Sequence, residues 1–340
     1  MMRLPRFQYY APREIAEAAQ FLAGEATDAM VIAGGTDLIP NMKRKQQMPK
    51  TLIGLRNIDS LKQIKNGSGL SLGAGLTLTD IVRNDNVKAG YAGLWQAAVQ
   101  VATPHLRNMG TLGGNICLDT RCSYYDQNYE WRKAINFCMK KEGEICWVST
   151  GSKRCLATSS TDTAPALISL GAKVRLQSAE GERELLLSDL YQDDGMDYLL
   201  RRPNEIVAAL ILPEAGNWQS TYWKLRRRGS FDFPVLSVAA AVSLAKDGSI
   251  DAARIVLGAV ASQPLVCEKV DEFLQGKKLS DEVIEEASAL CGKAARPVKN
   301  TDFAPAWRKR AIVRIASYAL QELRGDDMSE QRRKIAKHVL

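Results

Sequence analysis

Hydrophobic positions follow helical and strand spacing in turn along the first two thirds of the chain. Residues 13–23 carry apolar side chains three to four positions apart, which predicts a helix. A short apolar run at 29–33 predicts a buried strand that leads directly into a glycine pair. The same reasoning predicts strands at 51–55, 69–78, 172–177 and 206–212, and helices from Thr79, over 90–102 and over 164–171.

After Pro213 the pattern changes to longer strands followed by helices. Strands are predicted at 220–227, 237–246 and 253–260, with a tight turn at Asp247-Gly248, and helices at 271–273, 280–293 and 307–324. A boundary near 214–218 therefore separates a mixed α+β unit from the rest. Residues 116–160 show little periodicity, and we expect an inserted loop region held by something other than a core.

The composition is that of a globular protein. The chain has 340 residues, of which 46% are hydrophobic and 25% charged, so disordered and fibrous classes are excluded. Its longest apolar run, 235–245, is far shorter than the roughly 20 residues that span a bilayer. The first residues lack an apolar signal core, so we expect a cytoplasmic protein that does not bind a membrane.

The net charge of +8 comes from basic residues in separate short groups. No nucleic-acid-binding module is recognisable, and aromatic residues are only 7% of the chain, so no nucleic-acid partner is expected. These short groups of Lys and Arg are best interpreted as solvated charges on the protein surface. Some of them could instead face a phosphate-bearing cofactor or an acidic partner subunit.

Cysteine is distributed unevenly: five of the seven lie between Cys117 and Cys155. In a cytoplasmic loop such a group indicates a metal site rather than disulfides. The spacings lack the paired C-x₂-C knuckles that zinc usually shows, and they are compatible with a [4Fe–4S] cluster. Spacing alone leaves three alternatives, namely a cluster, zinc or unligated thiols. With only two histidines, a histidine-rich zinc site is excluded.

The chain contains two similar glycine turns. Ala33-Gly34-Gly35-Thr36-Asp37 comes after a predicted strand, and Thr111-Leu112-Gly113-Gly114-Asn115 has the same chemistry. A glycine pair lets backbone N–H groups approach a ligand closely, and a hydroxyl adds a donor, which suits a pyrophosphate. Neither turn is a Walker A loop or a Rossmann fingerprint, so a simple nicotinamide dehydrogenase is disfavoured.

The pair VIAGGTDL (31–38) and TLGGN (111–115) resembles the two FAD-contacting segments of flavoprotein subunits of the xanthine dehydrogenase family. The resemblance continues through 162–172 and 227–234 and covers about residues 3–325. It implies an α+β fold: a two-lobed FAD-binding domain like that of vanillyl-alcohol oxidase (the PCMH type), then a smaller α+β domain like the C-terminal domain of CO dehydrogenase flavoproteins.

The resemblance also implies roles for individual residues. The first segment would wrap the FAD pyrophosphate with Val31, Ile32, Ala33, Gly34, Gly35, Thr36, Asp37 and Leu38. A second cradle would consist of Thr111, Gly113, Gly114 and Asn115. Asp162 would lie near the ADP ribose, and Val101 and Val207 would touch the adenine or the flavin ring. No residue of this chain is expected to be catalytic.

The interval between Asn115 and Asp162 is some 35 to 40 residues longer than in ordinary members, and the cysteines lie in it. Such an insertion resembles that of the β subunits of 4-hydroxybenzoyl-CoA reductases, which binds an extra [4Fe–4S] cluster. The match assigns Cys122, Cys138, Cys146 and Cys155 as ligands; Cys117 is treated as a buried thiol, and Cys267 and Cys291 as core residues. The implied domains are 1–215 (lobes about 1–55 and 56–215, insertion about 117–160), 216–325 and a basic tail, 326–340.

The same resemblance implies a function for the chain. The chain would conduct electrons from a ferredoxin-like donor through [4Fe–4S] and FAD to the [2Fe–2S] clusters of a small subunit. A molybdopterin-binding large subunit would then dehydroxylate 4-hydroxybenzoyl-CoA, in a heterohexamer with two copies of each chain. The alternative is the FAD subunit of a hydroxylating molybdenum dehydrogenase that delivers electrons to NAD or a quinone, with zinc or nothing in the insertion. A non-enzymatic basic protein with a zinc module is a third, weaker hypothesis.

Overall fold

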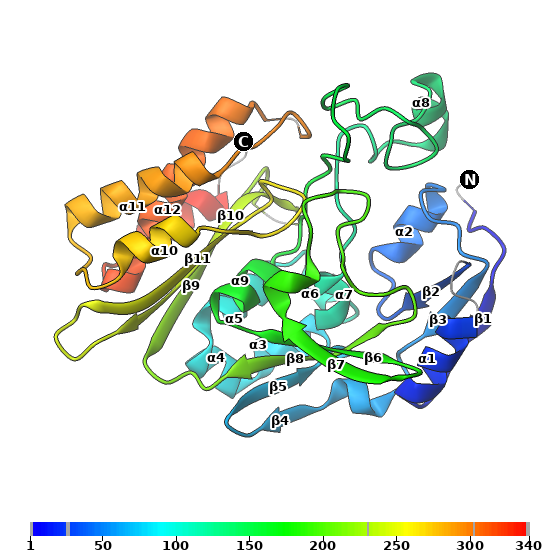
Figure 1. Cartoon of the computed structure of the whole chain (residues 1–340), viewed down its shortest axis with the longest axis horizontal. Helices are drawn as coiled ribbons and strands as arrows, with labels where there is room; N and C mark the ends of the chain where they lie inside the picture. The colour runs from blue at the N-terminus through cyan, green and yellow to red at the C-terminus, as the bar shows by residue number, and fades with distance from the viewer. Residues whose placement is uncertain (1–2, 25–27, 230, 302, 338–340) are drawn as a thin grey trace.

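A computed structural model describes residues 3–24, 28–229, 231–301 and 303–337. At its N-terminal end is a small parallel sheet in the order β1-β3-β2, with a helix packed beside it (Figure 1). The predicted helix and both strands of this unit are confirmed. The elements are β1 (Gln8–Tyr10), α1 (Ile15–Gly24), β2 (Ala29–Ile32), α2 (Leu38–Lys43), β3 (Thr51–Gly54) and the 3₁₀ helix η1 (Asp59–Lys62).

The second unit is a five-stranded antiparallel sheet in the order β4-β5-β8-β6-β7. Its strands are β4 (Ile64–Asn66), β5 (Gly69–Gly73), β6 (Lys173–Ser178), β7 (Gly181–Leu186) and β8 (Ile206–Pro213). Helices pack on it around the largest hydrophobic core. They are α3 (Leu78–Arg83), α4 (Asp85–Gly90), α5 (Ala92–Val99), α6 (Pro104–Arg107), α7 (Leu112–Ile116), α9 (Thr163–Ser169) and η2 (Leu187–Leu190).

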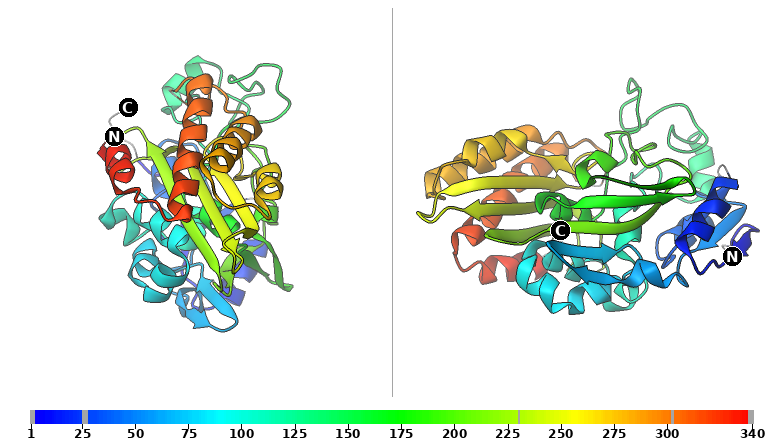
Figure 2. Two further views of the ribbon diagram at one scale, coloured as in Figure 1. Left: turned by 90° about the vertical axis from the view of Figure 1, so that its left-hand side faces the viewer. Right: turned by 60° about the horizontal axis from the view of Figure 1, so that its bottom comes forward.

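The C-terminal unit is an antiparallel sheet in the order β12-β11-β10-β9. One face packs on α10, α11 and α12, and the other on α5 and α9 (Figures 1 and 2). Side chains of β10 therefore alternate between two cores, which explains the long apolar run at 235–245. The strands are β9 (Trp218–Arg226), β10 (Pro234–Leu244), β11 (Ile250–Gly258) and β12 (Leu265–Val266); the helices are α10 (Glu268–Leu274), α11 (Asp281–Ala294) and α12 (Pro305–Arg324).

The predicted basic tail forms a further helix, α13 (Ser329–Lys337), and residues 338–340 lie outside the described part of the chain. Arg332 anchors this helix: its guanidinium pairs with Glu322 at 2.6 Å and lies 4.2 Å from the centre of the Trp223 ring. The tail is therefore part of the folded C-terminal unit, because Arg332 finds partners on β9 and α12.

The insertion at 117–160 projects beside the sheets and contains one short helix, α8 (Tyr129–Ala134) (Figure 1). We expected something other than a hydrophobic core to hold this segment, and the apolar interior that the structure shows is small. A small apolar cluster of Cys122, Tyr125, Cys138, Cys155 and Ala157 is buried inside it. The cysteines therefore form the interior of the insertion, because this segment has too few large aliphatic residues to build an apolar interior from them.

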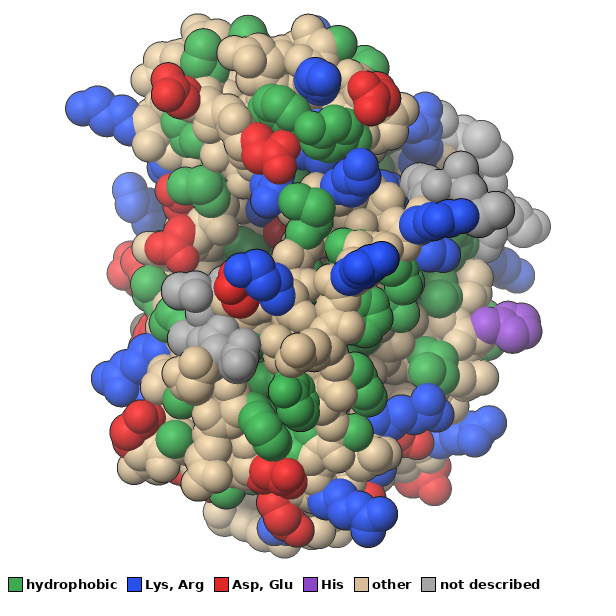
Figure 3. Space-filling model, turned by 90° about the vertical axis from the view of Figure 1, so that its right-hand side faces the viewer, with side chains coloured by type: hydrophobic (Ala, Val, Ile, Leu, Met, Phe, Trp, Pro, Cys, Tyr) green, Lys and Arg blue, Asp and Glu red, His purple; other side chains and the backbone are tan. Residues whose placement is uncertain are grey.

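Charged side chains are mixed over the surface. On the face drawn in Figure 3, Lys and Arg lie among acidic and apolar side chains without forming one continuous basic patch. This distribution is typical of solvated surface charge. Among the described helices, none is both long and apolar enough to cross a bilayer.

Candidate functional site

A cavity of about 470 Å³ lies where the N-terminal unit meets the five-stranded sheet, with residues 228 and 231–233 of the C-terminal unit at its edge. All the side chains and backbone segments that the resemblance assigned to FAD line it. They are residues 31–38, Val101, Thr111, Gly113, Gly114, Asn115, Asp162 and Val207. The fold therefore brings together five stretches that are far apart in sequence. That each of them contacts FAD stays a prediction.

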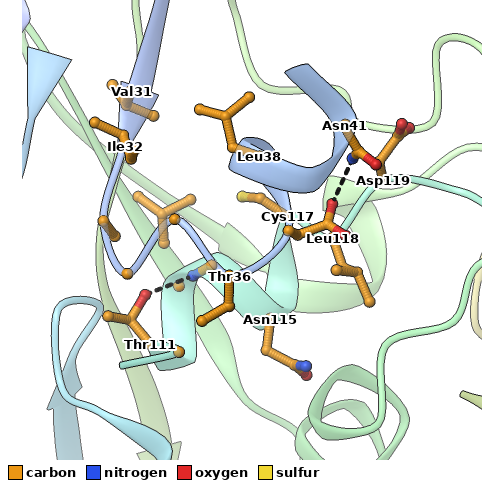
Figure 4. Close-up of a pocket in the computed structure, with 18 of the residues that line it drawn as sticks. Val31, Ile32, Thr36, Leu38, Asn41, Thr111, Asn115, Cys117, Leu118 and Asp119 are labelled. Atoms are coloured by element: carbon orange, nitrogen blue, oxygen red, sulfur yellow. Dashed lines mark hydrogen bonds between the residues drawn. The ribbon is translucent and has the colours of Figure 1, made fainter. Parts of the chain in front are cut away.

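The first glycine turn connects β2 to α2 and packs against Met109 and Gly110, directly before the second turn. Gly35 has a φ of +69°, a conformation that glycine adopts without strain. A Cβ atom on Gly34 would lie 1.8 Å from the carbonyl oxygen of Met109, so the two segments touch through their backbones. Figure 4 shows Thr36 between the turns and Val31, Ile32 and Leu38 around the cavity. Only glycine permits this approach.

The second turn opens helix α7. The Thr111 hydroxyl oxygen accepts a hydrogen bond from the Gly114 N–H at 3.1 Å (Figure 4). The Asn115 side-chain oxygen accepts bonds from the Thr161 hydroxyl at 2.8 Å and from the N–H of Thr163 at 3.1 Å, which ties the turn to the start of α9. Nearby, the buried Ser160 hydroxyl lines the cavity and has no hydrogen-bond partner among the described residues. An unpaired polar group at this place fits a polar ligand.

Asp162 joins the cavity to the C-terminal unit. Its carboxylate accepts hydrogen bonds from the Tyr222 hydroxyl at 2.6 Å and from the Lys224 ammonium at 2.9 Å, and both partners lie on β9. All three side chains are buried. Burial raises the pKa of the Asp162 carboxyl, and the charge of Lys224 opposes that rise. The carboxylate is thus already engaged within the protein, so it positions the cavity wall; a contact with the ribose stays a prediction.

Replacing Lys224 with methionine should lower the free energy of unfolding by about 3–5 kcal/mol, because Asp162 would be left as an unpaired buried charge. Urea unfolding followed by circular dichroism measures the change. Lys246→Met is the matched control: Lys246 is exposed beside the turn between β10 and β11, and its loss should cost no more than about 0.5 kcal/mol. Equal midpoints for the two variants would contradict the assigned role of the pair.

Arg121 is a cavity residue that the sequence did not indicate. Its guanidinium pairs with Asp37 of the first turn and, at 3.2 Å, with Asp126 of the insertion. It also lies 5.0 Å from the centre of the Phe233 ring. No motif contains Arg121, and only the folded chain brings these three partners to it. Its buried position fixes the turn, the insertion and the loop at the cavity edge relative to one another.

Tyr198 and Cys117 also line the cavity. Cys117 lies just after the second FAD-contacting segment and was expected to be a buried thiol, whereas Tyr198 was assigned no role. The Tyr198 hydroxyl donates a hydrogen bond to the Cys117 carbonyl oxygen at 3.1 Å. Cys117 is half-buried and does not belong to the apolar cluster of the insertion. The expected core positions of Cys267 and Cys291 are confirmed, since both lie in the C-terminal core.

The four cysteines assigned to a cluster are all buried and none forms a disulfide. Cys122, Cys138 and Cys155 share the apolar cluster, and Cys146 lies close enough to Cys155 to influence its ionisation. Burial raises the pKa of the Cys122 thiol to about 12 and that of Cys155 to about 11. Within the described ranges, no group of three or more His, Cys, Asp or Glu side chains is placed to hold a single metal ion.

Comparison with known proteins identifies the chain's relatives. The family described as "FAD binding domain in molybdopterin dehydrogenase" matches residues 5–215, and "CO dehydrogenase flavoprotein C-terminal domain" matches residues 220–323. The aldehyde oxidoreductase FAD-binding subunit PaoB of Escherichia coli is 34% identical over 77% of this chain and 83% of its own length. The carbon monoxide dehydrogenase medium chain of Afipia carboxidovorans is 28% identical over 86% of this chain and 88% of its own.

Solved structures agree on the fold. A carbon monoxide dehydrogenase from Hydrogenophaga pseudoflava matches with a TM-score of 0.78 at 24% identity, over 94% of this chain and 98% of that one. The predicted FAD-binding domain of PCMH type and the smaller C-terminal domain are therefore confirmed. The chain belongs to the molybdenum hydroxylase (xanthine dehydrogenase) family, as an FAD-binding medium subunit of the CO dehydrogenase type.

Proposed function

We propose that FAD lies extended in the cavity, with its pyrophosphate between the turn at 31–38 and the turn at 111–115. The observation that carries this proposal is that both glycine turns line one cavity, with Gly34 of the first packed against the residues directly before the second. Arg44, Arg201 and Arg228 also line it and supply positive charge for a diphosphate. Bound FAD supplies electron transfer in one- or two-electron steps, while the chain binds it, orients it and excludes water. The domain division near residue 215 is part of this proposal.

The second part of the proposal concerns the insertion: Cys122, Cys138, Cys146 and Cys155 hold a [4Fe–4S] cluster. Four buried thiols without a disulfide supply the donor set that such a cluster takes. Because burial raises the pKa of the Cys122 and Cys155 thiols, cluster binding must release the protons of these two groups.

The chain then works as an electron conduit in the cytoplasm. We infer a complex with a molybdopterin-binding large subunit and a small subunit carrying [2Fe–2S] clusters, two copies of each chain. Relatives described as "medium chain" or "FAD-binding subunit" support this composition. The insertion and the cavity lie side by side, with Arg121 pairing with a residue of each, so electrons could pass between cluster and flavin within this one chain.

The reaction of the complex has two candidates. Relatives named for aldehyde oxidation and carbon monoxide dehydrogenation favour a hydroxylating dehydrogenase that passes electrons to NAD or a quinone. The cysteine insertion favours the second candidate, reductive dehydroxylation of 4-hydroxybenzoyl-CoA with electrons from a ferredoxin-like donor. Two turnover assays of the purified complex discriminate between them. Turnover with an aldehyde and a quinone supports the first candidate, and turnover with reduced ferredoxin and 4-hydroxybenzoyl-CoA supports the second.

Anaerobic purification of the chain tests the cofactor assignment. Metal, sulfide and flavin analysis should give about four iron, four sulfide and one FAD, and the reduced protein should show the EPR signal of a [4Fe–4S] cluster. Zinc without sulfide would contradict the cluster and leave the flavin proposal intact. A chain without flavin absorption would contradict the placement of FAD.

A further inference from the structure

Lys140 is a cation enclosed between the cysteine insertion and the cavity. It comes from the insertion, two positions after Cys138, and its side chain is only 5% exposed. Its ammonium donates hydrogen bonds to the Asp119 carboxylate at 2.8 Å, to the Thr120 hydroxyl at 2.7 Å and to the Gly195 carbonyl oxygen at 2.6 Å. Three acceptors match its three donors, so its position is fully determined.

In the part of the chain that the structure describes, Lys140 pairs with one carboxylate, that of Asp119, which is 6% exposed. The other oxygen of Asp119 accepts a hydrogen bond from the Tyr125 hydroxyl at 2.9 Å. The ammonium also lies 4.9 Å from the centre of the Tyr125 ring and 5.4 Å from that of Tyr198. Because both side chains are buried, the ammonium of Lys140 and the carboxylate of Asp119 stabilise each other, and removing one would leave the other as an unpaired buried charge at a large cost in free energy.

This ion pair touches both functional regions. Asp119 and Tyr198 line the cavity (Asp119 is labelled in Figure 4). On the other side, the N–H of Gly195 donates to the Cys155 carbonyl oxygen at 2.8 Å, so the acceptor of Lys140 is itself held by a cysteine of the insertion.

We propose that Lys140 is a positioning residue that fixes the cavity wall formed by Asp119 and Tyr198 and balances the charge there, so that the midpoint potential of the bound flavin depends on the cysteine insertion. This inference rests on the proposed placement of FAD in the cavity and not on the cluster. Its physical basis is electrostatic. Reduction adds negative charge to the flavin. A lone carboxylate in the cavity wall repels this charge and disfavours reduction, whereas a neutral ion pair repels it less.

The sign of the effect can be tested with two single variants. K140M leaves the Asp119 carboxylate uncompensated and should lower the flavin midpoint potential. D119N leaves the ammonium uncompensated and should raise it. We expect each to change the ratio of reduced to oxidised flavin at a fixed potential about tenfold, which for two electrons is about 30 mV. The double variant D119N/K140M should return close to wild type, as expected for two residues that act on each other.

Redox titration of the full-length chain, followed by flavin absorption, measures these shifts. K153M, at an exposed lysine of the same insertion, is the control and should titrate like wild type. Shifts of the same sign in both single variants, or no shift while FAD remains bound, would overturn the inference. Should K140M fail to fold, K140R and D119N still decide it: K140R should keep the wild-type potential. Absence of FAD from the wild-type chain would instead contradict the proposed placement.

Discussion

Replacing Gly34 with alanine should weaken FAD binding about tenfold or more, or by ~1.4 kcal/mol. The added Cβ atom would lie 1.8 Å from the carbonyl oxygen of Met109, closer than any contact that atoms tolerate. One of the two turns must therefore move, and both line the same cavity. Flavin content per chain and titration of the apoprotein with FAD measure the loss. Gly114→Ala should act in the same direction, because its Cβ would lie 2.9 Å from the Thr111 hydroxyl oxygen that caps α7.

Gly67→Ala is the matched control for these variants. Gly67 is exposed between β4 and β5, and a Cβ there meets no atom within 4 Å, so flavin content should not change. Overpacking at Gly34 also costs about 1–3 kcal/mol of stability. Thermal unfolding of the apoproteins therefore accompanies the binding data and separates a lost cofactor from a lost fold. Full flavin occupancy in both Gly34→Ala and Gly114→Ala would show that the two turns are only structural.

Replacing Cys138 with alanine should remove nearly all iron and sulfide from the chain and leave FAD bound. With three thiolates left, the cluster lacks one of the four ligands it needs. Cys138 is buried in the insertion and does not line the cavity, so the flavin has no direct dependence on it. Iron and sulfide analysis and the flavin spectrum of the same anaerobic sample measure the two cofactors together.

The control for this variant is another buried cysteine. Cys267 is 2% exposed and lies in the C-terminal core, so Cys267→Ala removes a comparable thiol far from the insertion and should keep both cofactors. Unchanged iron in Cys138→Ala would refute its assignment as a ligand. Loss of FAD together with iron would mean that an intact insertion is needed to keep FAD bound, and would contradict the expected retention of FAD.

Much of the fold could be predicted from local sequence. The strand at 29–32 and the helix at 281–294 were found because apolar spacing is set by each element's own geometry. The glycine turns at 34–35 and 113–114 were found for a similar reason, since their chemistry lies in consecutive residues. The strand β1 and the helix α13 were not predicted. Contacts with other elements hold them, since β1 pairs with β3 and Arg332 of α13 pairs with Glu322 of α12 and Thr221 of β9.

The sequence by itself determined the family, the two turns and the unusual group of cysteines. Only the tertiary structure decided which charges meet at the cavity: Arg121 with Asp37, Lys224 with Asp162, and Lys140 with Asp119. Each of these pairs joins positions at least 21 residues apart. A lone lysine or aspartate carries no pattern in one sequence, and the cost of burying its charge arises only where folding removes it from water.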